Sequence, residues 1–474
     1  LAVGGLLNNN AGTIASNGAI AASAGSVSNQ GGTLQAGGAS NLSLTATGPL
    51  DNSAGGKILA GGNTTLAAGS LNNNAGSVTA VGDLNATIGG AATNVGGTLA
   101  ANGNTTLTAA SLDNSAGTTA AVSGNLNVTT TGTTTNGGGT LQAGGATTLS
   151  NGGLSNQSGK VFGNSLVVDT HGNTLNNTQG TLAATTTVAV SSGALVNDAG
   201  LVQTGAAMTI HTNGQSLSNT NAAGYSNGQG GITSGGTLTL NTGAVSNTAG
   251  FIGANGALTA DTQAFTNTSG GLVLSQSTVA IHTQGAGYDN SGGQTLAVGD
   301  VGINAGSIAN VGGLIRSTAT TTLNAGSIDN RLTSGAEQGI EGQNVAIAAT
   351  TVDNTAGAIR ADVNTTLTSS GRIDNGAGGL IHAGGTLAIV DPNAANPGAK
   401  TLSVANGGTL LAGKALVVDA ASLANTGRLL SQQDMRLVLT QDAVFAAGSE
   451  TIANRDLGIA TTGNIRNSGR VAAG

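Results

Sequence analysis

Three aspartates at matching places in a repeated sequence are the residues best suited to chemistry. Asp329, Asp353 and Asp374 each stand one position before an asparagine that recurs along the chain. If matching positions stack, neighbouring carboxylates lie about 5 Å apart, which is the spacing of the acid and the nucleophile in a retaining glycosidase. Clustered carboxylates can also hold a cation. A polysaccharide-active enzyme is therefore one hypothesis.

A structural role for these aspartates is the favoured interpretation. Arg331, Arg360 and Arg372 occur near them in the sequence and could balance their charge. Exposed ion pairs of this kind are common and contribute little free energy. Enzymes that cleave sugars also need aromatic platforms, and the chain has only four Phe, two Tyr and no Trp. We therefore predict no catalytic residue and no enzyme activity.

The histidines do not form a recognisable metal site. His171, His211, His282 and His382 have no companion at the spacing of metal ligands. No phosphate-binding loop, G-x-S-x-G nucleophile elbow or calcium-binding nonapeptide occurs. The sequence thus predicts neither a metal nor a cofactor.

The elements that would position any site come from a repeat of about 21 residues. An asparagine recurs two residues after an aliphatic residue and is usually followed, three residues later, by Gly. Its first ten copies are Asn9, Asn29, Asn52, Asn73, Asn94, Asn114, Asn136, Asn156, Asn177 and Asn197. Fixed self-similarity of this kind is typical of a solenoid. We predict a structural Asn ladder bonded from coil to coil, with Asn and Gly supplying the positive φ of the corners.

Residues 50–71 show how one repeat should fold. Short strands are predicted at 57–60 and 64–68, with a third beginning at Ser70, and Gly-containing turns separate them. Three strands that return to the same place make one coil of a parallel β-helix. Each strand then pairs with its counterpart one coil along, at about 4.8 Å. From Asn9 to Asn467 we count about 22 coils, which would stack over about 100 Å.

The exceptions to the repeat are candidate binding regions. The interval from Asn219 to Asn247 is long, and so is the one from Asn375 to Asn406, whereas the coil near Phe445 lacks the asparagine. Insertions in a solenoid become surface loops, where binding often occurs. We predict loop insertions near 219–236 and 391–400. The weak partner-binding candidates within them are Tyr225, Asp391, Pro392 and Pro397.

Composition limits the partners. The chain has 474 residues, 7% charged residues and a net charge of −7, without a basic cluster, so a nucleic-acid partner is not expected. No apolar run approaches the roughly 18 residues that cross a membrane, so membrane insertion is not expected either. Low charge also suits a stack, because like charges about 4.8 Å apart in adjacent coils would cost about 1 kcal/mol in water.

The repeats LDNSAGGKILAGG at 50–62 and LNNNAGSV at 71–78 resemble filamentous haemagglutinin repeats of bacterial two-partner-secretion exoproteins. That family includes adhesins and the stick proteins of contact-dependent growth inhibition. The resemblance covers residues 1–474 and implies a right-handed parallel β-helix with export through an outer-membrane partner. The family's Asn-Pro-Asn secretion motif and Val-Glu-Asn-Asn toxin junction have no match. We therefore expect one repeat domain, 1–474, from the middle of a longer fibre.

The resemblance favours a secreted shaft on the bacterial surface that presents distal binding or toxin domains. Its expected partners are the outer-membrane two-partner-secretion transporter during export and a receptor on a host or neighbouring cell. Two alternatives stay open beside it. One is the polysaccharide-active β-helix enzyme, and the other is an ice-binding solenoid, suggested by Thr pairs such as Thr64-Thr65 and Thr105-Thr106.

Overall fold

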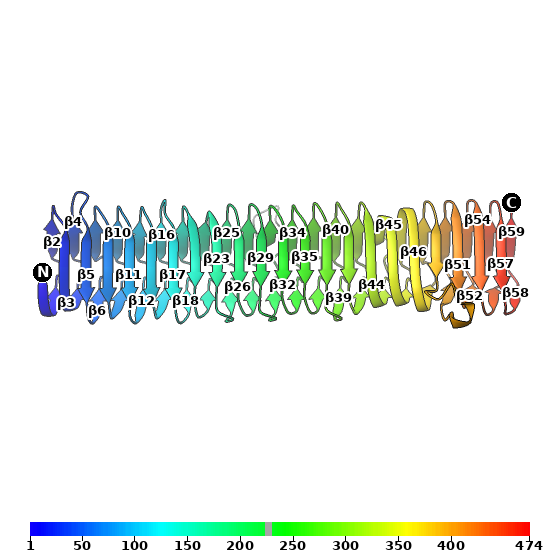
Figure 1. Ribbon diagram of the computed structural model, residues 1–474, viewed down its shortest axis with the longest axis horizontal. Helices are drawn as coiled ribbons and strands as arrows, with labels where there is room; N and C mark the ends of the chain where they lie inside the picture. Colours follow the sequence, from blue (N-terminus) through cyan, green and yellow to red (C-terminus); the bar gives the residue numbers. More distant parts are fainter. Residues whose placement is uncertain (223–229) are drawn as a thin grey trace. The chain divides into compact units, whose positions relative to one another are not determined.

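Parallel strands and the short turns between them make up nearly all of the described chain. The computed structural model describes residues 1–222 and 230–474, which fall into two compact units, Leu1–Gly243 and Ala244–Gly474. Each unit is a stack of coils (Figure 1), and the predicted all-β parallel solenoid of about 22 coils is confirmed. Among the described residues the helical element is the short 3₁₀ helix η2 (Pro397–Ala399). No described helix has the length and apolar character that a membrane crossing needs.

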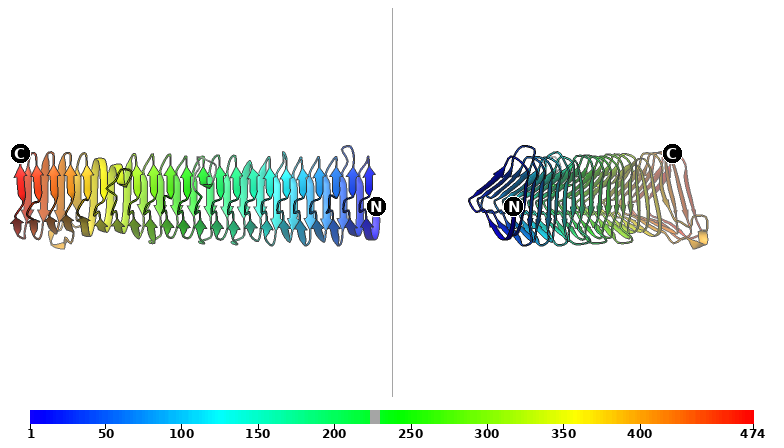
Figure 2. Two further views of the ribbon diagram at one scale, coloured as in Figure 1. Left: turned by 180° about the vertical axis from the view of Figure 1, so that it is seen from behind. Right: turned by 60° about the vertical axis from the view of Figure 1, so that its left-hand side comes forward.

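Two successive coils of the first unit show the three-strand pattern. The first coil contains β7 (Lys57–Ala60), β8 (Thr64–Ala68) and β9 (Ser70–Asn72). The next contains β10 (Ser77–Ala80), β11 (Leu84–Ile88) and β12 (Ala91–Thr93). Each strand pairs in parallel with the one at the same place in the neighbouring coil. Figure 2 shows this stacking from behind.

Alternation along each strand builds the core. In β8, Leu66 is 1% exposed, whereas Thr65 on the opposite face is exposed. Leu66 stacks on Leu44 of the preceding coil and on Ala86 of the following one. Burying a side chain of leucine size contributes roughly 1.5–3 kcal/mol. Continuous columns of aliphatic side chains therefore hold the coils together.

The second unit departs from three short strands at one place. Three long strands follow one another there: β44 (Thr320–Asp329), β45 (Gly339–Asp353) and β46 (Ala358–Asn375). β46 pairs with β47 (Leu380–Ala383), β48 (Leu387–Val390) and β49 (Ser403–Asn406), which form the three sides of the next coil. The register between β45 and β46 shifts near two corners. Bulges thus let an extended chain bend where other coils use Gly-containing turns.

The turn after each ladder asparagine corrects one prediction. No described ladder asparagine has a positive φ; the residue two positions later often does, as at Ala54, Ala75 and Ala116, with φ of 53–54°. Glycine holds this position in other coils, as at Gly31 and Gly96. The asparagine keeps the strand conformation, because its side chain must point inward to reach the next coil. The left-handed corner is therefore built by its neighbours.

Ala75→Gly should stabilise the protein by about 0.5 kcal/mol. A left-handed alanine costs about 1–2 kcal/mol, and the entropy that glycine adds to the unfolded chain offsets about 0.5–1 kcal/mol of the relief. Ala67→Gly, in β8, is the control and should destabilise by about 0.5–1 kcal/mol. Urea midpoints followed by circular dichroism would measure both. A lower midpoint for Ala75→Gly would contradict the strain argument.

Candidate functional site

The Asn ladder is the most extensive polar arrangement of the first unit. From Asn9 to Asn219, each side-chain Nδ2 donates to the Oδ1 of the ladder asparagine one coil along, at 2.7–2.8 Å. The same Nδ2 also approaches main-chain carbonyls, as Asn177 does at Gly180 (3.2 Å) and Leu201 (3.1 Å). Asn9 is 6% exposed and the other ladder asparagines of this unit are fully buried. The ladder amides are hydrogen-bonded inside the stack and are not accessible to a binding partner.

A second ladder runs through the other unit and ends at an aromatic residue. It extends from Asn247 to Asn425 with Nδ2–Oδ1 distances of 2.7–2.8 Å. Phe445, which is 1% exposed, occupies the next place in register with Asn425. The Asn425 Nδ2 donates instead to the Thr451 Oγ1 and the Glu450 carbonyl, both at 3.2 Å. The coil without an asparagine thus supplies a hydroxyl acceptor for Asn425, the last asparagine of this ladder.

Both units contain buried hydroxyl side chains at one place in the repeat, and the sequence did not predict them. Thr170 and Thr212 in the first unit, and Thr283 in the second, each end or follow the second strand of a coil and are fully buried. Each hydroxyl donates to a main-chain carbonyl of the turn that follows, at 2.5–2.6 Å. A Ser or Thr at this place in successive repeats was the available signal. Like the ladder amides, these hydroxyls give main-chain carbonyls a hydrogen-bond partner inside a corner.

The three aspartates do stack as their spacing predicts. Asp329 of β44 lies in register with Asp353 of β45, which lies in register with Asp374 of β46. Arg331 donates to both carboxylate oxygens of Asp329, from Nε at 2.9 Å and from Nη2 at 2.7 Å, and its Nε is 3.7 Å from Asp353. The Arg372 Nη2 is 2.6 Å from Asp374. All five side chains line one surface depression.

Arg360 does not join this group, contrary to the expectation that it balances an aspartate. Its Nη1 donates to Glu341 at 2.9 Å and to the Gln338 carbonyl at 3.0 Å. Glu341 also accepts from the Arg316 Nε at 2.8 Å. Arg316, Glu341 and Arg360 follow one another in register, so the charge alternates along the column. Alternation removes the like-charge repulsion that stacking would otherwise cause.

The electrostatic surroundings of Asp329 do not suit a general acid. The hydrogen bond from Arg331 lowers the pKa of Asp329 below its usual value, so this carboxyl is ionised at neutral pH and cannot serve as a general acid. Arg331 and Arg372 each occupy a carboxylate oxygen, of Asp329 and Asp374 respectively. No group of His, Cys, Asp and Glu within the described ranges is arranged to hold a metal. The depression is therefore a set of ion pairs.

Arg331→Met should raise the pKa of Asp329, because it removes the side-chain hydrogen bond and the positive charge that lower this pKa, whereas burial, which raises it, remains. The lowered pKa in the native protein means that ionised Asp329 contributes stability above its unfolded-state pKa, and that this contribution is lost as pH falls through the folded-state pKa. Carbon-13 NMR titration of the aspartate carboxyls would measure the shift. Arg436→Met, in β54 (Asp434–Leu439), is the control and should leave Asp329 unchanged. An unchanged pKa in Arg331→Met would refute the assigned cause.

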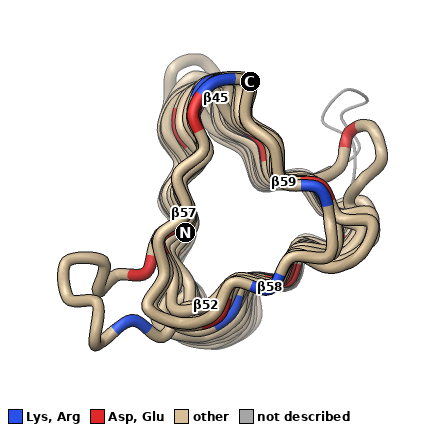
Figure 3. Tube along the Cα trace, turned by 90° about the vertical axis from the view of Figure 1, so that its right-hand side faces the viewer, with Lys and Arg blue, Asp and Glu red and all other residues tan. Residues whose placement is uncertain are grey.

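The insertion between β48 and β49 is an ordered loop that projects from the outline of the coils (Figure 3). Asp391 is fully buried at its base, and its carboxylate accepts the main-chain amides of Asn393 (2.8 Å), Thr401 (2.6 Å) and Leu402 (2.7 Å). Burial raises the pKa of Asp391, but these amides, Leu402 first, outweigh it and lower the pKa overall. The loop is thus closed by its own carboxylate.

A buried ion pair fixes the other end of this loop. The Lys400 side chain is 1% exposed and pairs with Asp419 of β51 (Ala415–Ala420). Of the predicted partner-binding residues, Pro392 and Pro397 are exposed on the loop, whereas Asp391 is enclosed. Tyr225 lies outside the described residues. A partner at this loop would meet the two prolines and not the carboxylate.

The repeats of this chain match one known protein family. The haemagglutinin repeat family matches residues 1–54, 41–95, 80–127, 121–161, 161–222, 216–286, 268–336 and 327–391. These overlapping segments together cover residues 1–391 of 474. No curated protein and no solved structure matches the chain. On the strength of repeats that span most of its length, the chain belongs to the haemagglutinin repeat family.

Proposed function

We propose that this protein is the rigid shaft of a secreted bacterial surface adhesin, which presents distal binding or toxin domains. The observation that carries the proposal is the pair of buried Asn ladders, each uninterrupted over its own range. Each ladder bond contributes about 0.5–1.5 kcal/mol net, and every coil adds strand pairing and an aliphatic layer to it. Bending or stretching a coil must disturb all of these interactions together. A stack of this kind is suited to bearing load and holding a distal domain at a distance.

Membership of the family supports a setting for this shaft. Haemagglutinin repeats point to a secreted adhesin, and we propose export through an outer-membrane two-partner-secretion transporter. The receptor would lie on a host or neighbouring cell and would be bound mainly by other parts of the fibre. The repeat region, 1–474, would act as one structural domain. The loop with Pro392 and Pro397 would make at most weak contacts.

Small-angle X-ray scattering of the purified chain tests the shaft. A rod of about 100 Å has a radius of gyration of about 30 Å, whereas a globular protein of this length has about 23 Å. Deleting residues 53–94 removes two coils and joins Asn52 to Val95 in register. This variant should fold cooperatively and be about 10 Å shorter. A globular scattering profile for the parent, or unchanged dimensions after the deletion, would contradict the proposal.

Neither alternative function gains support from a specific observation. Arg331 and Arg372 form ion pairs with Asp329 and Asp374, two of the three aspartates that a polysaccharide-active enzyme would use. Thr64 and Thr105 are buried. Their outward-facing neighbours do not form a continuous threonine column, because Asn85 stands in register between Thr65 and Thr106. We accordingly propose no catalytic role. We expect the purified chain to show no glycan turnover, which would argue against the enzyme, and no thermal hysteresis, which would argue against ice binding.

A further inference from the structure

One corner of the first unit is shorter than its neighbours. Two residues, Asn164 and Ser165, connect Gly163 to Leu166, whereas three residues, 185–187, connect the matching Ala184 to Val188 in the next coil. The missing residue falls between β22 (Lys160–Gly163) and β23 (Ser165–Asp169). The corner is tight: a Cβ on Gly163 would lie 2.5 Å from the Ser165 carbonyl oxygen. The receding corner leaves a surface notch.

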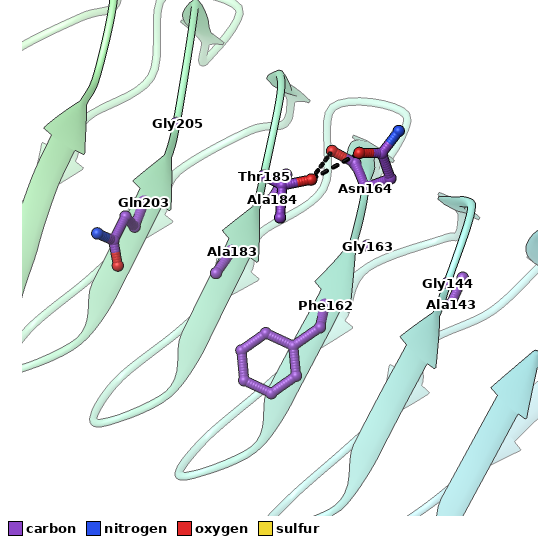
Figure 4. Close-up of a pocket in the computed structure, with 10 residues that line it drawn as sticks. All are labelled: Ala143, Gly144, Phe162, Gly163, Asn164, Ala183, Ala184, Thr185, Gln203 and Gly205. Carbon is purple, nitrogen blue, oxygen red and sulfur yellow. Dashed lines mark hydrogen bonds between the residues drawn. The ribbon is translucent and has the colours of Figure 1, made fainter. Parts of the chain in front are cut away.

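An outward-facing aromatic ring forms one wall of this notch. Phe162 is partly exposed, whereas the other described aromatic side chains, Phe251, Phe265, Tyr288 and Phe445, are at most 8% exposed. Phe162 lies in register with Ala183, which lies in register with Gln203. Ring and amide therefore stand two coils apart, about 9.6 Å, with a small alanine between them (Figure 4). The space between them suits a ring the size of a sugar.

The polar groups around the notch are neutral and partly available. The Thr185 hydroxyl donates to the Asn164 side-chain oxygen at 2.6 Å and so orients that amide, as Figure 4 shows. Neither the Asn164 Nδ2 nor the Gln203 side-chain amide makes a hydrogen bond within the part of the chain that the structure describes. None of the ten lining residues carries a formal charge. The notch thus offers an aromatic face and neutral donors and acceptors.

From this geometry we propose that the Phe162 notch binds a neutral pyranose unit of a glycan on the side of the shaft. The electron-rich face of Phe162 attracts the C–H groups on one face of a sugar ring, and the amides of Gln203 and Asn164 pair with hydroxyls. An extended peptide fits less well, because β22 and β25 (Thr181–Ala184) spend their main-chain groups on neighbouring coils and leave no free edge. The absence of charge in the lining disfavours phosphate or sulfated ligands. Sugar binding at the notch would add lateral contacts to a shaft. The proposal that the notch binds a sugar does not depend on the protein being a shaft.

Saturation-transfer NMR with cellobiose, lactose and N,N′-diacetylchitobiose as probes tests the proposal on the full chain. At least one probe should bind, with the strongest transfer to the protons of one ring face. Phe162→Ala should weaken that binding at least tenfold, Phe162→Tyr should retain it, and Gln203→Ala should weaken it a few-fold. Val167→Ala, at an exposed position of β23, is the matched control and should bind as the parent does. Thermal unfolding by circular dichroism verifies that each variant folds.

Several outcomes would overturn the proposal. They are no binding of any probe, equal binding by folded Phe162→Ala, and preference for a sulfated disaccharide over its neutral counterpart. Phe162-dependent binding of members of a tripeptide library, with no binding of the sugars, would assign the notch to a peptide. None of these results bears on the scattering test, so the shaft and the notch are judged separately.

Discussion

Replacing Gly313 with alanine should lower the free energy of unfolding by about 3 kcal/mol. Gly313 follows the ladder residue Asn310 by three positions, where the chain passes over the preceding coil. A Cβ there would lie 2.2 Å from the Asn290 main-chain oxygen and 2.6 Å from the Asn310 Oδ1. One of these atoms belongs to the backbone and the other to the ladder, so neither can move without lengthening hydrogen bonds. The same close approach occurs at Gly97 and Gly159, which explains the Gly that follows most ladder asparagines.

Gly302→Ala is the matched control for this prediction. Gly302 lies in β41 (Val301–Asn304), and a Cβ there would meet no atom within 4 Å. Alanine should therefore stabilise the strand by about 0.5–1 kcal/mol. Urea unfolding of both variants, followed by circular dichroism, would separate steric from conformational effects. Equal midpoints for Gly313→Ala and Gly302→Ala would show that close approach does not explain the conserved spacing of Gly within this chain's repeats.

The regular coils could be predicted because their causes are local and repeated. The strands of the coil with β7, β8 and β9 fall at the residues expected, since alternating burial and glycine-rich corners fix both their faces and their ends. The three aspartates before Asn330, Asn354 and Asn375 stack because they share one place in the repeat. Periodicity alone was sufficient for these features.

Features that depend on exact register or on main-chain strain could not be predicted in this way. Arg360 is close to Asp353 in sequence, but it faces Glu341 because it lies on another side of the coil. Ala75 adopts a positive φ, which alanine rarely does, so its residue type gave no indication of it. The shortened corner at Asn164 changes the repeat length by a single residue, within its normal variation, and only strand pairing reveals it. The three features depend on the side of the coil, on a backbone angle and on the length of one corner, none of which the repeat spacing specifies.

Asn177→Ala should cost about 3 kcal/mol, because it interrupts the ladder inside a dry stack. The Asn156 Nδ2 loses its 2.7 Å acceptor but still approaches the Gly159 and Thr181 carbonyls, at 3.2 Å each. The Asn197 Oδ1 loses the Asn177 Nδ2 that donates to it at 2.7 Å, and Asn197 is fully buried. A buried polar atom without a partner costs about 1–3 kcal/mol, and the small cavity left by the amide adds to this.

Asn94→Ala makes the same chemical change where a replacement donor is at hand. The orphaned acceptor would be the Asn114 Oδ1, which also accepts from the Thr119 hydroxyl at 3.0 Å. The cost should therefore be about 1 kcal/mol smaller than for Asn177→Ala. Adding Thr119→Val to Asn94→Ala should abolish the difference, and urea unfolding of these variants would measure it. If Asn94→Ala and Asn177→Ala were equally unstable, unsatisfied acceptors would not set the ladder's energy. Loss of the asparagines' own packing would then remain as the explanation for why this chain repeats them so regularly.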